Sequence, residues 1–190
     1  MLVVSIPAAA LAQHGTSGNA PLSTSAPREA TQFDFLIGQW ELVATPKVGG
    51  LAAKIHGSPK LPGVWKAWKA FDGWGIEDEL RLMDGSGNPR LLAHAMRMYD
   101  GAAKKWSATT LDVYRSRFQA SSAEWANNEM IIVSKGTDAE GKSTTTRIRF
   151  YNIKPNTFSW IQDRSEDDGK TWNEGTLKIE AKRIAATAPR

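Results

Sequence analysis

Side chains that could bind a ligand gather in the two β-rich runs on either side of Pro155-Asn156. If the turn between these runs holds an even number of residues, strand alternation places one polar and aromatic set on a common face. That set is Arg147, Arg149, Tyr151, Phe158, Trp160 and Gln162. Turned inward, the face would bind an amphipathic ligand through guanidinium donors above aromatic walls. Turned outward, its arginine stems would shield the rings from water, and both orientations stay open here.

A second candidate ligand-binding residue is His94, in the run 91–99. Alternation places it on one face with Leu92, Met96 and Met98. A neutral imidazole in such surroundings suits an axial haem ligand or a hydrogen-bonded histidine of the core. Ten-stranded haem-binding barrels carry their ligand histidine towards the C-terminus, whereas no histidine follows His94 in this chain. We therefore expect a core histidine and keep haem binding as a third functional hypothesis.

Carboxylates offer the remaining chemistry, in the run Glu77-Asp78-Glu79. Asp78 shares its strand face with Ile76, Leu80 and Leu82, and burial among them would suit it for acid or base work. An isomerase, cyclase or hydratase acting on a hydrophobic substrate is therefore the alternative function. The plainer interpretation is an acidic run in water. The sequence contains no Ser-His-Asp order, no phosphate-binding loop and no metal-ligand spacing. We therefore assign no catalytic residue, no metal site and no cofactor.

The composition narrows the classes of protein that the chain can belong to. Its 190 residues, 41% hydrophobic and 23% charged, indicate one globular domain. The absence of cysteine excludes disulfides and thiolate metal sites. The net charge of +4 is mild, and its five lysines between Lys47 and Lys69 accompany no nucleic-acid module, so we expect a basic loop in that region and no nucleic-acid partner.

Short β-rich runs separated by Gly, Pro, Asn and Asp continue from Phe33 to the end of the chain. Short connections favour pairing of neighbouring strands in order, so the pattern predicts an all-β fold, a single antiparallel up-and-down β-barrel of about ten strands. The insertion 48–63 would be a lid or a short helix. The expected strands are 39–47, 65–72, 76–83, 91–99, 104–113, 117–123, 129–135, 143–152, 157–164 and 173–183.

Two motifs add to this pattern. The run Phe33-Asp34-Phe35-Leu36-Ile37-Gly38-Gln39-Trp40 is an apolar plug followed by Gly-x-Trp, which predicts a close chain approach at Gly38 and a Trp40 ring that closes one barrel end. The run Ser165-Glu166-Asp167-Asp168-Gly169-Lys170-Thr171-Trp172 matches an Asp-box. Sialidases repeat that box in every propeller blade, whereas one copy here indicates a hairpin turn rather than glycosidase chemistry.

The order of these motifs resembles that of an uncharacterised family of exported bacterial calycin-like, or lipocalin-like, proteins. The segments that carry the resemblance are the plug with Gly-x-Trp, the run Met98 to Trp106 with Leu111-Asp112, the strand Thr146 to Phe150 and the Asp-box hairpin. The resemblance covers residues 33–183 and implies the barrel and export. It implies no activity. We therefore expect a secreted or periplasmic protein that binds a small apolar or amphipathic ligand, with anionic ligands included in that class.

The N-terminal region predicts export to the periplasm or the medium. Residues 1–12 resemble the end of a signal peptide, since an apolar run leads to Ala10-Leu11-Ala12. Residues 13–32 are rich in Ser, Thr, Pro and small residues and are expected to form a disordered linker. The barrel domain would then span 33–184, with a disordered tail at 185–190. No stretch approaches the roughly 20 apolar residues of a membrane-spanning helix.

Overall fold

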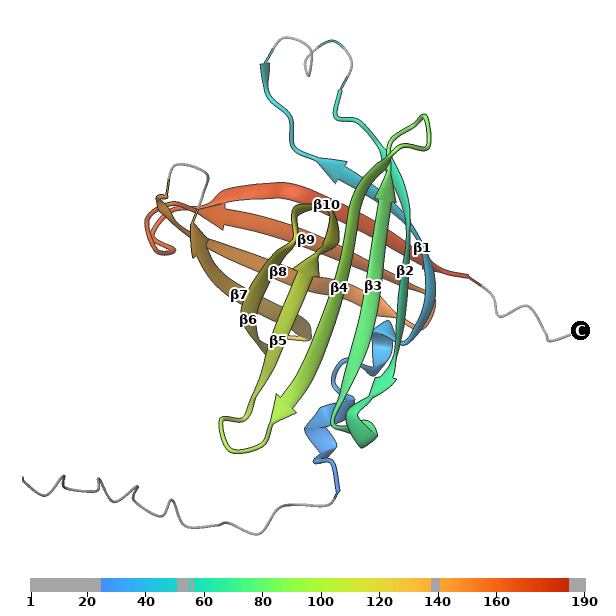
Figure 1. Ribbon diagram of the computed structural model, residues 1–190, viewed down its shortest axis with the longest axis vertical. Helices are drawn as coiled ribbons and strands as arrows, with labels where there is room; N and C mark the ends of the chain where they lie inside the picture. The colour runs from blue at the N-terminus through green and yellow to red at the C-terminus, as the bar shows by residue number, and fades with distance from the viewer. Residues whose placement is uncertain (1–24, 51–54, 56, 138–140, 185–190) are drawn as a thin grey trace, which may run out of the picture.

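The computed structural model describes residues 25–50, 55, 57–137 and 141–184, and these residues form a closed antiparallel barrel (Figure 1). Each strand pairs with its neighbours in the chain, and β1 pairs with β10 to close the sheet. The predicted up-and-down barrel is confirmed. The strands within the described residues are β1 (Gly38–Pro46), β2 (Leu61–Ala70), β3 (Gly75–Met83), β4 (Pro89–Asp100), β5 (Lys105–Asp112), β6 (Arg117–Ala126), β7 (Glu129–Thr137), β8 (Ser143–Lys154), β9 (Thr157–Ser165) and β10 (Asn173–Arg183).

All ten expected strands are present, most with ends within two residues of the predicted ones. The largest difference is β2, which begins at Leu61 rather than at Trp65. It starts earlier because Leu61 pairs with Ala44 of β1, so the insertion predicted for 48–63 is shorter. Within what remains of that insertion, residues 51–54 and 56 lie outside the described residues.

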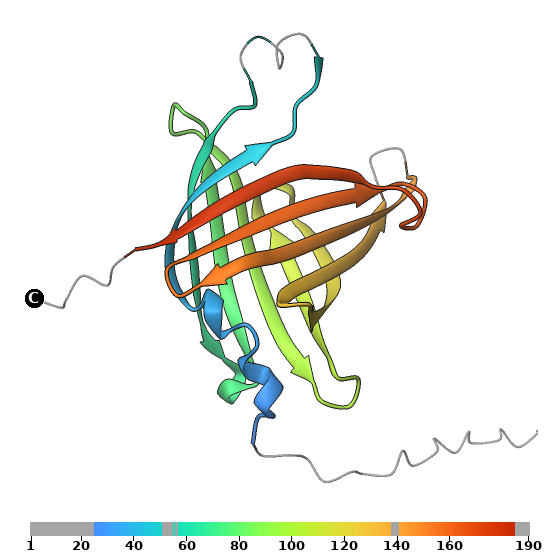
Figure 2. The same cartoon turned by 180° about the vertical axis from the view of Figure 1, so that it is seen from behind.

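An N-terminal plug closes one end of the barrel. It consists of two 3-10 helices, η1 (Arg28–Thr31) and η2 (Asp34–Leu36), drawn in blue in Figures 1 and 2. Phe33 is fully buried between them, and its ring meets the Trp106 ring edge-on with centroids 4.8 Å apart. Leu36 is fully buried as well. Burial of these side chains removes apolar area from water and fixes the end of the barrel.

The expected disordered linker 13–32 is wrong for its last residues. Residues 28–31 form η1, in which Ala30 is buried. The side-chain oxygen of Gln32 accepts a hydrogen bond from the indole N–H of Trp106 at 3.0 Å. Small and polar residues in this segment therefore dock on the barrel through Ala30 and Gln32. Residues 1–24, with the signal segment and His14, and the tail 185–190 lie outside the described residues.

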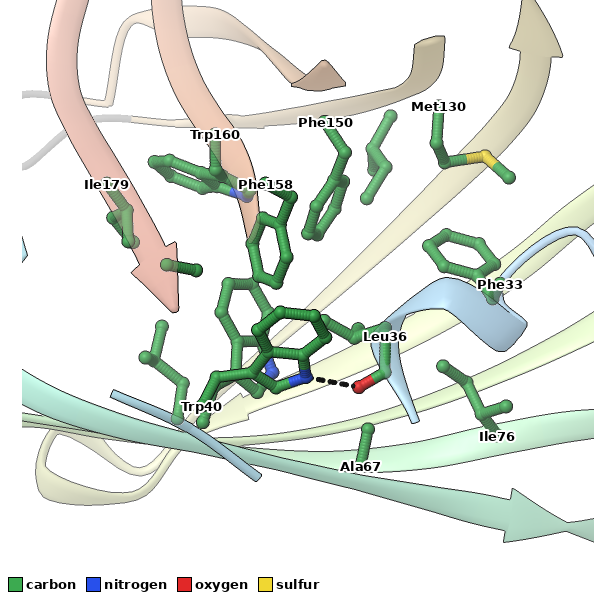
Figure 3. Packing of buried hydrophobic residues seen from close by; sticks show 14 of the residues in the cluster. Phe33, Leu36, Trp40, Ala67, Ile76, Met130, Phe150, Phe158, Trp160 and Ile179 are labelled. Atoms are coloured by element: carbon green, nitrogen blue, oxygen red, sulfur yellow. Dashed lines mark hydrogen bonds between the residues drawn. The ribbon is translucent and has the colours of Figure 1, made fainter. Parts of the chain in front are cut away.

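The Gly-x-Trp motif holds the plug to the first strand. Trp40 is fully buried, and its indole N–H donates to the carbonyl of Leu36 at 2.7 Å (Figure 3). The Arg183 guanidinium lies 4.0 Å from the centre of the Trp40 ring and donates to the carbonyls of Ile37 and Phe35. Gly38 has a φ of 122°, and a Cβ there would collide with the Arg183 guanidinium. The predicted close approach at Gly38 is thus a contact with Arg183.

The Asp-box forms the turn between β9 and β10, as its sequence predicts. Asp167 accepts hydrogen bonds from the backbone N–H and the hydroxyl of Thr171, at 2.8 and 2.7 Å. The Ser165 hydroxyl donates to Asp167 and accepts from the backbone N–H of Gly169. Gly169 has a φ of 88°, which glycine adopts without strain. The box is a hydrogen-bonded turn that lies outside the barrel cavity.

Candidate ligand cavity

A cavity of about 280 Å³ occupies the barrel interior and is partly open to solvent. The plug fills the end at which β1 begins, where the connections 71–74, 101–104 and 127–128 also lie. The cavity reaches Asp112, the last residue of β5, and Arg117, the first of β6. Both residues lie at the opposite end of the barrel. The cavity therefore opens at the end away from the plug.

Polar side chains of the lining lie towards the opening on one side of the barrel. On β7, β8 and β9 the lining residue nearer the open end is polar, and the next inward-facing residue is apolar. These pairs are Ser134 and Ile132, Thr146 and Ile148, and Gln162 and Trp160. On β3 and β4 the order is reversed, because Leu80 and Leu91 lie nearer the opening than Asp78 and Arg97. The uncharged polar residues of the lining, called the polar rim, are Thr110, Gln119, Ser121, Ser134, Thr146 and Gln162, and the apolar residues, called the apolar wall, are Trp65, Leu80, Leu91, Ala93, Ala95, Ile132, Ile148, Trp160 and Leu177.

A buried ion pair borders the cavity on the side of β3 and β4. The Arg97 guanidinium donates from Nε and Nη2 to the two carboxylate oxygens of Asp78, at 2.8 and 3.1 Å. The indole N–H of Trp65 donates to the same carboxylate at 2.8 Å. The alternation that places Asp78 among Ile76, Leu80 and Leu82 is confirmed, and the interpretation of Asp78 as part of an acidic run in water is wrong. Glu77 and Glu79 lie on the outer face of the same strand.

The rim of the cavity carries an excess of positive charge. Asp112 is neutralised from outside the cavity, because its carboxylate pairs with the Arg115 guanidinium at 2.7 Å. Asp78 is neutralised by Arg97. Arg117 also lines the cavity, and its side chain makes no ion pair or hydrogen bond with any residue of the described part of the chain. Of the four charged lining residues, Arg117 is therefore the one left to attract an anion.

The face predicted for the Pro155-Asn156 hairpin is wrong. Phe158, Trp160 and Gln162 face the interior, whereas Arg147, Arg149 and Tyr151 lie on the outer face of β8. The cause is a β-bulge, since two residues of β8, Asn152 and Ile153, oppose the single residue Phe158 between the pairs Tyr151–Ser159 and Lys154–Thr157. The extra residue moves the side chains of β8 that precede the bulge, including Arg147, Arg149 and Tyr151, to the face opposite the predicted one. Asn152 has a φ of 51° at this bulge.

Arg147 and Arg149 belong to a polar cluster on the outer face of the barrel. Arg147 donates to the buried carboxylate of Asp163 at 2.9 and 3.1 Å and stacks on Trp172, 4.2 Å from its ring centre. Arg149 reaches the same carboxylate at 3.4 Å. Burial by itself would raise the pKa of Asp163, but the backbone N–H of Gly175 and these guanidinium groups hold it below its ordinary value. This cluster ties β8 to β9 and β10.

His94 lies on the outer face of β4, so the expectation of a core histidine is wrong. Its side chain is partly exposed, beside the Trp68 ring, with centroids 5.9 Å apart. From that face His94 cannot reach a haem held in the cavity, so the haem hypothesis based on it is wrong as well. The interior positions of β4 belong to Ala93, Ala95 and Arg97. His56 lies outside the described residues.

The described residues contain neither a group of metal ligands nor a membrane-spanning helix. Across the described ranges, no group of three or more His, Cys, Asp and Glu residues could hold a metal ion. In the same residues, no helix is both long enough and apolar enough to span a membrane.

A scan against protein-family models finds no match, and a search of curated proteins finds none. What is shown is the closed antiparallel barrel of ten strands within the described residues.

Proposed function

We propose that this barrel is a binding protein for a small amphipathic anion, exported from the cell and built like the calycin-like proteins that its motifs resemble. The observation that carries the proposal is the unpaired Arg117 side chain at the opening of a cavity whose walls are largely apolar. A ligand would place its apolar body against Trp65 and Trp160 and leave its acidic group near Arg117. Polar rim residues such as Gln162 and Ser134 supply further hydrogen-bonding groups.

The cavity volume limits the size of this ligand. At about 280 Å³ the space lies near the lower end of small-molecule pockets. A single aromatic ring with a short acidic side chain fits such a space better than a long acyl chain. Candidate ligands are therefore compact amphipathic acids.

Binding accounts for the interior charges better than the alternative isomerase, cyclase or hydratase. A catalytic Asp78 would need a carboxylate oxygen free to exchange a proton with substrate. One oxygen of Asp78 accepts from Trp65 and Arg97, and the other accepts from Arg97. Proton transfer would therefore require the loss of hydrogen bonds that hold β2, β3 and β4 together.

Tryptophan fluorescence tests the proposal, because Trp65 and Trp160 line the cavity. Titration with a panel of compact aromatic acids should change the emission, and Arg117→Ala should weaken the best ligand about fivefold. That factor corresponds to about 1 kcal/mol, the upper value for an exposed ion pair. Higher salt should weaken binding to the wild type.

Two matched variants separate a specific site from general charge attraction. Arg90→Ala removes the same charge near the same barrel end, but Arg90 lies outside the cavity lining. Arg149→Ala removes an outer-face arginine, so neither variant should change affinity. If no acid alters the emission at about millimolar concentration, or if Arg90→Ala weakens binding as much as Arg117→Ala, the proposed site is wrong. N-terminal sequencing of the native protein tests export separately, with a start expected near Gln13.

A further inference from the structure

At the deep end of the cavity, one nitrogen of the Arg97 guanidinium has no partner among the other residues. Nε and Nη2 both donate to Asp78, which occupies one side of the planar group, so Nη1 points away from that carboxylate. In the described residues Nη1 makes no hydrogen bond to another residue, and it is not one of the fully enclosed side-chain atoms that lack a partner. The Arg97 side chain is only 7% exposed and lines the cavity. Nη1 therefore borders the cavity space, where a buried donor needs an acceptor.

Arg97 and Arg117 enter the cavity at different depths. Arg117 lies at the open end, where it pairs in the ladder with Asp112 of β5, and Asp112 pairs in turn with Ala93 of β4. Arg97 follows Ala93 by four residues, about 13 Å further along the strand. Its guanidinium lies 5.3 Å from the ring centre of Phe33, which places it at the floor, the end of the cavity next to the plug. A ligand held between the two arginines would lie lengthwise in the cavity.

The floor and the opening of the cavity differ in charge. At the floor the Arg97 charge is compensated by Asp78, and both side chains are less than a tenth exposed. A ligand carboxylate placed there would bring a second negative charge beside Asp78 without a free cation to balance it. A neutral oxygen avoids that cost and still accepts a charge-assisted hydrogen bond from Nη1. The floor therefore favours a neutral acceptor, whereas Arg117 at the opening favours an anion.

We infer that the ligand is a compact aromatic acid with a neutral oxygen acceptor, such as a ketone or ester carbonyl, at the end opposite its acidic group. The acceptor receives a hydrogen bond from Nη1 of Arg97, and the acidic group lies near Arg117. This inference rests on the proposed function, because it assigns the far end of the same ligand. Small side chains leave room beside Arg97, since its ladder neighbours on β5 and β6 are Ala108 and Ser121.

Three acids of similar size test this inference by calorimetry on the full chain. The first, 4-acetylbenzoate, carries an acid and a neutral acceptor at opposite ends of one ring. The second, 4-isopropenylbenzoate, has a methylene group in place of the ketone oxygen, and terephthalate has a second carboxylate in place of the acetyl group. The wild type should bind 4-acetylbenzoate about tenfold or more tightly than 4-isopropenylbenzoate, the loss expected when a charged donor is left without its acceptor. Terephthalate should also bind more weakly than 4-acetylbenzoate, because of its second charge.

Two variants separate the floor from the opening. Arg117→Ala should weaken 4-acetylbenzoate and 4-isopropenylbenzoate by the same factor, so the preference between them should stay. Arg97→Lys keeps a positive charge beside Asp78 but lacks the planar fork, so the preference should disappear. A readout that needs no variant is the infrared stretch of the ¹³C-labelled ketone, whose frequency falls when the carbonyl accepts a hydrogen bond. Bound to the wild type, the ketone should absorb at or below its frequency in water.

Equal affinity of the wild type for 4-acetylbenzoate and 4-isopropenylbenzoate would overturn the inference, as would a preference that Arg97→Lys retains. A bound ketone that absorbs above its frequency in water would overturn it too, because the carbonyl would then lie in apolar surroundings. In each of these cases, binding that still depends on Arg117 leaves the proposed function in place. If no acid binds at all, the inference and the proposed function are both wrong.

Discussion

Replacing Asp78 by alanine should cost about 3 to 5 kcal/mol of the free energy of unfolding, the usual loss when one partner of a buried ion pair is removed. The Asp78 and Arg97 side chains are only 3% and 7% exposed. The substitution leaves the Arg97 guanidinium without its counter-ion and the indole N–H of Trp65 without its acceptor. A domain has only about 5 to 15 kcal/mol in total, so this variant should be close to unfolding at moderate temperature.

Equilibrium unfolding in urea, followed by tryptophan emission, measures this loss. The matched control is Asp112→Ala, which also removes a paired carboxylate from the cavity lining. Its partner Arg115 is 59% exposed, and the Asp112 carboxylate also accepts the backbone N–H of Arg115 as a helix cap. The control should therefore lose about 1 to 2 kcal/mol, less than Asp78→Ala. The double variant Asp78→Leu with Arg97→Met removes both charges, and its loss should fall well below the sum of the two single losses.

A small effect of Asp78→Ala would contradict this reasoning. If the variant loses no more stability than Asp112→Ala, water in the cavity solvates Arg97, and the pair does not hold β3 and β4 together. Additive losses in the double variant would lead to the same conclusion. Binding of a compact acid by the double variant then shows whether the pair has a role in ligand recognition.

Four further variants test the plug, the bulge and the Asp-box. Gly38→Ala should lower the melting temperature by several degrees, because its Cβ would displace the Arg183 guanidinium and its φ of 122° disfavours any side chain. Asn152→Val should destabilise the barrel by about 1 to 3 kcal/mol in thermal circular dichroism and Asn152→Gly should not, since the bulge holds φ at 51°; equal effects would contradict the bulge. Hydrogen bonds from Thr171 and Ser165 lower the pKa of Asp167 to about 2. Its ionised form therefore stabilises the fold above the unfolded pKa of about 3.9, and that stabilisation is lost as pH falls through about 2. Asp167→Asn should accordingly have a lower urea midpoint than the wild type at pH 5, and the two midpoints should converge near pH 2.

The cavity could be predicted from the sequence only in part. Of the seven residues proposed as ligand-binding, Trp160 and Gln162 line it, Phe158 is buried in the core beneath it, and His94, Arg147, Arg149 and Tyr151 lie on the outer face. Arg97 and Arg117 were missed as site residues. A signal for Arg97 was present, because it alternates with the small residues Ala93 and Ala95, and small side chains on one strand face indicate a wall that borders an interior space.

Local pattern determined the number of strands, their order and the plug. Period-two alternation, turn residues and the Gly-x-Trp motif act over a few residues, so they can be recognised without knowing what lies across the sheet. They predicted an all-β barrel, and they grouped Asp78 on one strand face with Ile76, Leu80 and Leu82. Export and the identity of the ligand stay predictions.

Tertiary structure alone decided which face of β8 points inward and which charges meet. A bulge at Asn152 and Ile153 has no reliable sequence signal, yet one extra residue moves Arg147 and Arg149 from the predicted face to the opposite one. The contact of Asp78 with Arg97 likewise depends on the register between β3 and β4, which pairs Asp78 with Ala95 and brings Arg97 beside it on the diagonal. Register is a property of two strands together, and neither strand specifies it alone.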